Sequence, residues 1–231
     1  MKITLLRRVV AEFIGSLFLL AAVVGSGIMG ERLAGGNVAL ALLANAIATG
    51  AALVAIILAF GPISGAHLNP VVTLADAWQG GIIWREVPFY MVAQFAGAFA
   101  GVAVAHLMFG LMLFSPSTHM RSGPPQAFSE FVATFGLLAV IWGGARQRSS
   151  AVPFAVGAYI TAAYWFTAST SFANPAVTIA RSLTNTFAGI RPVDTIPFVL
   201  AQLAGAIAVT LLIRWLTPPS RQTTTAQKSL D

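Results

Sequence analysis

Two short stretches of the chain decide how the rest of it is organised. The first, SGAHLNPVVTLADAW, runs from Ser64 to Trp78, and the second, SFANPAVTIARSLTN, runs from Ser171 to Asn185. Each places Asn-Pro before one apolar residue and then Val-Thr. Asn is a favoured helix N-cap and Pro suits the first helical position. Each stretch therefore predicts a short helix, over about residues 69–79 and 174–184, too short to cross a bilayer.

The composition around these motifs is that of an integral membrane protein. Of 231 residues, 57% are hydrophobic and 9% are charged, whereas soluble domains are about 25% charged. The chain has no Cys and its three His are scattered, so we predict no metal site and no cofactor. The net charge of +6 lies at the ends of apolar runs and does not predict nucleic-acid binding.

Six stretches are long and apolar enough to span a membrane, which takes about 20 residues. They cover about residues 8–30, 38–60, 87–110, 127–145, 152–168 and 194–216. The sequence therefore predicts an all-α membrane protein with six transmembrane helices and two re-entrant half-helices. We expect one domain over residues 1–217 and a disordered cytoplasmic tail over residues 218–231.

The two halves of the chain, about residues 5–113 and 125–217, repeat each other. AEFIGSLFLL from Ala11 matches SEFVATFGLL from Ser129, and VPFYMVAQFAGA from Val87 matches IPFVLAQLAGA from Ile196 with a one-residue gap. Each half holds three spans, an odd number, so the second half must be inverted relative to the first. The matched polar positions are Glu12 with Glu130, Gln94 with Gln202, and Asn69 with Asn174.

Basic residues indicate the orientation in the membrane, because they are enriched on the cytoplasmic side. With both termini inside, the inner segments carry nine of them and the outer segments carry four. The inner set is Lys2, Arg7, Arg8, Arg85, Arg146, Arg148, Arg214, Arg221 and Lys228, and the outer set is Arg32, Arg121, Arg181 and Arg191.

Two inverted half-helices bring their N-termini together near the middle of the membrane. Each N-terminus carries about half a positive charge and unpaired N–H groups, so a cation is repelled there and a neutral solute is not. The amides of Asn69 and Asn174 can donate hydrogen bonds into the path. The loops before them, residues 61–68 and 168–173, expose backbone carbonyls, which is tolerated where they line a water-filled cavity. The pattern favours water and small hydroxylated solutes.

The paired motifs, together with AEFIG and the two Ala-Gln-x-x-Gly segments, resemble the aquaporin (major intrinsic protein) family over about residues 5–217. The resemblance implies a passive pore in each subunit of a homotetramer in the lipid bilayer. It assigns the two pore triplets to Asn69, Pro70 and Val71 and to Asn174, Pro175 and Ala176. The first triplet departs from the family in Val71, where Ala is usual, and we expect a slight narrowing there.

A second departure bears on selectivity. The family usually has Arg directly after the second triplet, and here that residue is Val177. The resemblance places the other three filter positions at Thr49, Ala162 and Ser171. None of the four is charged or aromatic, so we expect a wide and less polar filter. Polyols, urea and metalloid hydroxides should then pass as well as water.

Val177 alone resembles the filter of plant vacuolar-membrane aquaporins, whereas NPVVT with SFANPAV more closely resembles bacterial aquaglyceroporins of the AqpS type, found in arsenic-resistance operons. This likeness implies conduction of arsenous acid, extending to methylated arsenicals, for arsenic efflux across the bacterial inner membrane. A general water, glycerol and urea facilitator without an arsenic role is the alternative.

Each of four polar side chains allows two interpretations of its role. Arg181, one turn beyond Val177, is either a charged vestibule residue or an interfacial anchor. Glu12 and Glu130 either support the two pore loops or relay protons, and their mirrored positions favour support. His67 either lines the pore mouth as a pH-sensitive group or packs within its loop.

Two other functions fit the pattern less well. An ion-coupled transporter also uses inverted repeats and broken helices, but no acid or His cluster accompanies the Asn-Pro pair. An intramembrane enzyme would need a catalytic set, and none is in register, so we do not expect an enzyme.

Overall fold

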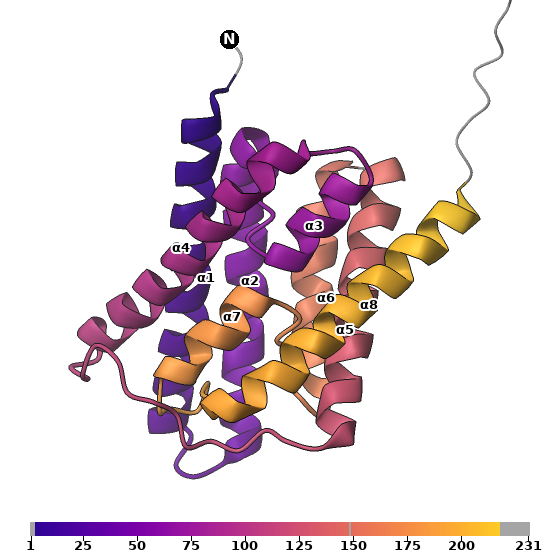
Figure 1. The fold of residues 1–231 in the computed structure, drawn as a ribbon. Helices are drawn as coiled ribbons and strands as arrows, with labels where there is room; N and C mark the ends of the chain where they lie inside the picture. The colour runs from indigo at the N-terminus through magenta and orange to yellow at the C-terminus, as the bar shows by residue number, and fades with distance from the viewer. Residues whose placement is uncertain (1–2, 148, 218–231) are drawn as a thin grey trace, which may run out of the picture.

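The computed structural model describes residues 3–147 and 149–217, and within these ranges the regular structure is helical (Figure 1). The predicted tail, residues 218–231, lies outside the described residues. Short 3-10 turns precede or follow several of the helices. The α-helices are α1 (Leu5–Leu33), α2 (Val38–Ser64), α3 (Pro70–Trp78), α4 (Val87–Met108), α5 (Pro124–Gln147), α6 (Val152–Phe166), α7 (Pro175–Ala180) and α8 (Thr195–Leu216).

The long helices match the predicted spans in place and order. In the described part of the chain, five of them are long and apolar enough to cross a membrane: α1, α2, α4, α5 and α8. The sixth, α6, has 15 residues and thus a length of about 22 Å, which is shorter than a hydrocarbon core of about 30 Å. It ends before the predicted residue 168 because Thr167 is extended and leads into the second pore loop.

The two half-helices begin where the Asn-Pro motifs predict. The side-chain oxygen of Asn69 accepts from the N–H of Val71 at 3.1 Å, and that of Asn174 accepts from Ala176 at 2.9 Å. Pro occupies the first turn of both helices. The second is shorter than predicted: α7 ends at Ala180 and continues only as a 3-10 turn over Arg181–Leu183.

The halves of the molecule pack in the same way. Helix α1 packs closely against α4, and its counterpart α5 packs against α8. A side chain at Gly97 would collide with the carbonyl of Phe13, and one at Gly205 would collide with the carbonyl of Phe131. Glycine at these matched positions therefore allows both helix pairs to approach closely.

The arrangement of the helices brings the two half-helices end to end. Figure 1 shows α3 and α7 in the two opposite halves of the bundle, while the start of α1 and the end of α8 lie at the same end of the molecule. Helices α3 and α7 contact each other, and each also contacts helices of the other half, α8 and α4 respectively. The opposed N-termini of α3 and α7 mark the centre of the candidate site.

Candidate pore

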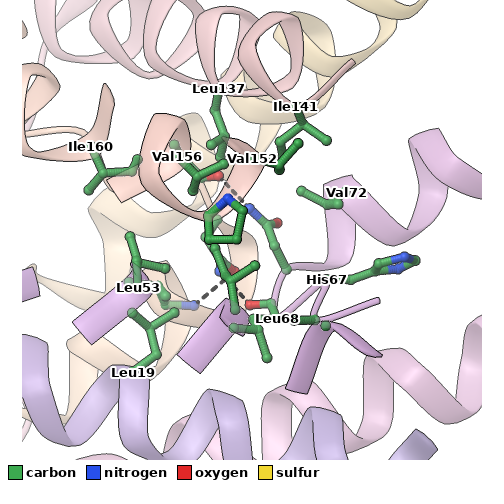
Figure 2. Close-up of a pocket in the computed structure, with 18 of the residues that line it drawn as sticks. Leu19, Leu53, His67, Leu68, Val72, Leu137, Ile141, Val152, Val156 and Ile160 are labelled. Carbon is green, nitrogen blue, oxygen red and sulfur yellow. Dashed lines mark hydrogen bonds between the residues drawn. The ribbon is translucent and has the colours of Figure 1, made fainter. Parts of the chain in front are cut away.

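A cavity of about 660 Å³ runs beside the two Asn-Pro junctions. Its walls come from α1, α2, α3, α5, α6 and α7 and from both loops that precede the half-helices. Most of the lining is apolar, as Figure 2 shows for the labelled side chains Leu19, Leu53, Val72, Leu137 and Ile160. Asn69 and Asn174 are also in the lining. The site is thus an apolar passage with a few polar groups at fixed places, a composition typical of solute-binding cavities.

The two Asn side chains lock the loops to each other. The amide nitrogen of Asn69 donates to the carbonyl oxygen of Ala173 at 2.8 Å, and that of Asn174 donates to Leu68 at the same distance. An Asn amide has two N–H donors, so each side chain keeps one for the cavity. The half-helix N-termini thus present two donors and two positive dipole ends to a passing solute.

The two buried carboxylates hold the loops from behind. Glu12 accepts hydrogen bonds from the backbone N–H groups of the two residues before Asn69, at 2.9 and 2.7 Å. Glu130 does the same for the two residues before Asn174, at 2.9 and 2.8 Å. Gln94 and Gln202 donate to Glu12 and Glu130 at 2.8 and 2.6 Å. Through these hydrogen bonds the two carboxylates hold the two pore loops in place.

The loops need that support because their backbone is unusual. Leu68 and Ala173, directly before the two Asn, have φ of +53° and +49°. Ala66, Thr170 and Ser171 also have positive φ. A non-glycine residue in this region costs about 1–3 kcal/mol, and such residues persist only where the surroundings fix them. The carboxylate hydrogen bonds stabilise this conformation of the two loops, whose residues line the cavity.

Three of the four expected filter residues come together in the cavity lining: Thr49, Ser171 and Val177. The fourth does not. Ala162 is exposed on the outer face of α6, whereas Ile160 and Tyr164 of the same helix line the cavity. Two residues along a helix turn through about 200°, so positions 160 and 164 share a face that excludes position 162. Assigning Ala162 by its distance from the Asn-Pro motif overlooked this register.

The lining is also more polar than the four predicted residues suggested. Arg181 is 2% exposed and lines the cavity, and its guanidinium lies 3.4 Å from the centre of the Phe172 ring. Its Nε donates to the carbonyl oxygen of Ala188. The aromatic Tyr164 was missed although it follows Val156 and Ile160 at helical spacing, a pattern that could have identified it.

Two further predicted residues lie at the α3 side of the site. Val71 is fully buried among Leu138, Ala206 and Val209, so its extra bulk packs against α5 and α8 instead of narrowing the cavity. His67 lines the cavity, with its Nε2 3.7 Å from an oxygen of Asp76. It also packs against α4, since the centre of its ring lies 5.4 Å from that of the Tyr90 ring.

The chain is similar to known proteins in sequence and in fold. Aquaglyceroporin AqpS of Rhizobium meliloti (strain 1021) is 57% identical over 217 residues, which cover 94% of this chain and 93% of that protein. Aquaporin NIP1-4 of Oryza sativa subsp. japonica is 36% identical over 90% of this chain and 76% of its own length. The solved aquaglyceroporin from Plasmodium falciparum shares the fold, with a TM-score of 0.72 at 20% identity and coverage of 90% and 95%.

These features define a multi-pass membrane channel built on two mirrored re-entrant helices. The profile of the family described as Major intrinsic protein matches residues 1–171 and 144–231, so the whole chain is covered. The chain belongs to the major intrinsic protein family. It is accordingly a passive channel for small neutral solutes and not an enzyme.

Proposed function

We propose that the chain is a wide-filter channel for glycerol-like polyols, water, arsenous acid and methylated arsenicals, and that it serves arsenic efflux. The observation that carries the proposal is Val177, which lines the cavity at the position where the family usually has Arg. Thr49 and Ser171 line the same cavity. Identity of 57% to an aquaglyceroporin supports glycerol-like solutes. The resemblance of both motifs to channels of arsenic-resistance operons supports the choice of arsenous acid.

The residue at position 177 limits the size of the solute that can pass. A guanidinium at position 177 would fill part of the passage and supply up to five N–H donors, whereas valine supplies a short apolar surface. Arsenous acid is a small neutral trihydroxide, similar to glycerol in shape, and is larger than water. A cavity of about 660 Å³ with short side chains at positions 49, 171 and 177 accommodates such a solute.

The setting of the channel is part of the proposal. We propose that it is a single channel domain, with halves at about 5–113 and 125–217, that assembles as a homotetramer in the bacterial inner membrane. Both termini are cytoplasmic. The basic residues Arg7, Arg8, Arg85 and Arg214 support this orientation, because all belong to helix ends on the side where α1 starts and α8 finishes.

The test compares several solutes in the same proteoliposomes. Stopped-flow light scattering would measure the entry of water, glycerol, urea and arsenous acid against protein-free vesicles. We expect accelerated entry of glycerol and arsenous acid, with water as a third substrate. Entry of water alone would contradict the wide filter. Entry of glycerol and urea without arsenous acid would instead identify a general solute facilitator.

A further inference from the structure

We propose that Tyr164 takes the filter position assigned to Ala162, and that with Thr49, Ser171 and Arg181 it forms a polar constriction. This constriction would select solutes with several hydroxyl groups. The inference rests on the proposed function, since a filter matters only if the chain conducts solutes. It changes the expected character of the filter from uncharged and non-aromatic to one with a phenol and a guanidinium.

The packing of α2 on α6 brings two of these groups together. Gly50 and Gly157 face each other so closely that a side chain on either would collide with the opposite helix. This close approach places the hydroxyl of Thr49 3.2 Å from the hydroxyl of Tyr164, and both residues are buried. Both also line the cavity. The hydrogen-bonded pair therefore forms part of the wall at a fixed position, and its remaining donor and acceptor sites are open to a solute.

Ala162 does not line the cavity because it belongs to the outward face of α6. Phe154, Ala158, Ala162 and Trp165 are all exposed and follow one another at intervals of four, four and three residues. This spacing is one stripe on a helix. Val156, Ile160 and Tyr164 form the opposite stripe and line the cavity. A side chain at position 162 thus faces away from the passage.

Arg181, one helical turn beyond Val177, adds to the passage a positive charge that Val177 does not supply. Among the described residues, its Nε has a hydrogen-bond acceptor, the carbonyl of Ala188, and no acceptor is found for its two terminal nitrogens. The neighbouring Arg121 differs, since its Nε and both terminal nitrogens donate to backbone carbonyls at 2.8–3.4 Å. Arg121 therefore braces the loops, whereas Arg181, which lines the cavity, keeps donors for a solute.

Ser171 supplies the fourth group. Its hydroxyl oxygen is buried and has no hydrogen-bond partner among the described residues, and the residue lines the cavity. A buried polar atom without a partner is costly, so a solute that satisfies it is favoured. The guanidinium only donates hydrogen bonds, while the three hydroxyls both donate and accept. A polyhydroxylated neutral solute can use all four groups, which an equally large apolar solute cannot.

Cysteine labelling tests the placement without any transport measurement. The natural chain has no Cys, so each variant carries a single thiol. In vesicles holding Tyr164→Cys, Thr49→Cys or Ala162→Cys, we expect a charged, membrane-impermeant methanethiosulfonate to modify the first two and not the third. Modification of Ala162→Cys with protection of both other variants would overturn the inference. A wild type that conducts no glycerol would overturn the proposed function, while the labelling would still decide the position of Tyr164.

A milder substitution tests the chemical role of the phenol. Tyr164→Phe keeps the ring and removes the hydroxyl, and Ala162→Val is the matched control, adding bulk on the exposed face. We expect Tyr164→Phe to lower the ratio of glycerol to water permeability by about fivefold, the equivalent of one neutral hydrogen bond at the barrier. Ala162→Val should leave the ratio unchanged. An unchanged ratio in Tyr164→Phe, or a fall in Ala162→Val, would contradict the role proposed for Tyr164.

Discussion

The two ends of the pore share one scaffold and differ in their chemistry. On the α3 side, Gln94 donates to Thr73 at 2.9 Å, and on the α7 side Gln202 donates to Thr178 at 2.8 Å. Each Thr stands four residues after its Asn, and each Gln also donates to the loop-supporting carboxylate. Residues common to both halves thus hold the half-helices in place.

Four of the positions that differ between the halves line the cavity. Two residues before the Asn, the α3 side has His67 and the α7 side has Phe172. Seven residues after it, the α3 side has Asp76 and the α7 side has Arg181. All four line the cavity, so one end pairs an imidazole with a carboxylate and the other stacks a guanidinium on a phenyl ring. Residues shared by the repeats thus hold the loops, and we expect these four differing residues to influence which solutes pass.

The largest expected effect concerns the shared scaffold. Glu12→Gln or Glu130→Gln replaces a carboxylate with an amide that cannot accept all the hydrogen bonds made to it. Because buried N–H groups are then left unpaired, we expect each change to lower the free energy of unfolding by about 3 kcal/mol or more. Thermal unfolding in detergent micelles would measure both. If one variant were as stable as wild type, the two carboxylates would not be equivalent supports.

The second-largest expected effect distinguishes the charged residue at the α7 end of the pore, Arg181, from the one at the α3 end, Asp76. Arg181→Gln removes a fixed positive charge, which at about 5 Å and an effective dielectric constant near 20 repels a monovalent cation by about 3 kcal/mol. We expect cation conductance in planar bilayers to rise by up to about a hundredfold. Asp76→Asn is the matched control and should not raise it. Equal conductance in wild type and Arg181→Gln, with the variant folded by size-exclusion chromatography, would show that the charge does not face the passage.

A smaller change narrows the α7 end alone. Val177→Arg should lower glycerol and methylarsenical permeability by about tenfold through added bulk, a barrier increase of about 1.4 kcal/mol, while water still passes. Thr49→Phe should act in the same direction. Val177→Met adds length without charge and distinguishes size from polarity. Unchanged glycerol entry in vesicles containing Val177→Arg would mean that position 177 is not at the constriction.

The smallest effect concerns pH at the α7 end. Partial desolvation and the positive charges of Arg121 and Arg181 lower the pKa of His119 below its ordinary value. His119 therefore binds a proton more readily in the unfolded chain than in the folded chain. The contribution of the neutral ring to the free energy of unfolding is complete above about pH 6.5, the ordinary pKa of His, and is lost as the pH falls through the lower pKa of the folded state. We expect the melting temperature to drop slightly less between pH 7.5 and 5.5 in His119→Gln than in wild type. An equal drop in both would exclude His119 as the cause.

The sequence predicted the parts of the molecule that depend on local and repeated signals. Asn-Pro fixes a helix start through capping, and the spans and the mirrored Glu and Gln follow from hydropathy and repetition. These elements lie where predicted, apart from differences of a few residues at helix ends. The early end of α6 was not predictable from hydropathy, because apolar residues continue into the loop that begins at Thr167.

The lining of the cavity was less predictable because it depends on contacts between distant segments. Counting from the motif placed Ala162 in the filter, whereas the rotation of α6 and the Gly50–Gly157 contact bring Tyr164, and not Ala162, to the cavity lining. The burial of Arg181 likewise depends on tertiary contacts, here with Phe172 and Ala188, which approach it only in the folded chain. Helical periodicity could have suggested Tyr164, but no local signal fixes the direction of the Arg181 side chain.

The most direct test of the account asks whether arsenous acid equilibrates or accumulates. Proteoliposomes containing the wild-type chain would be incubated with labelled arsenite, with and without an imposed proton or sodium gradient. A passive channel for a neutral solute predicts that the internal concentration rises to the external value and stops there, at the same level under all conditions. Accumulation above the external concentration, or entry that requires the gradient, would contradict the channel and indicate an ion-coupled transporter.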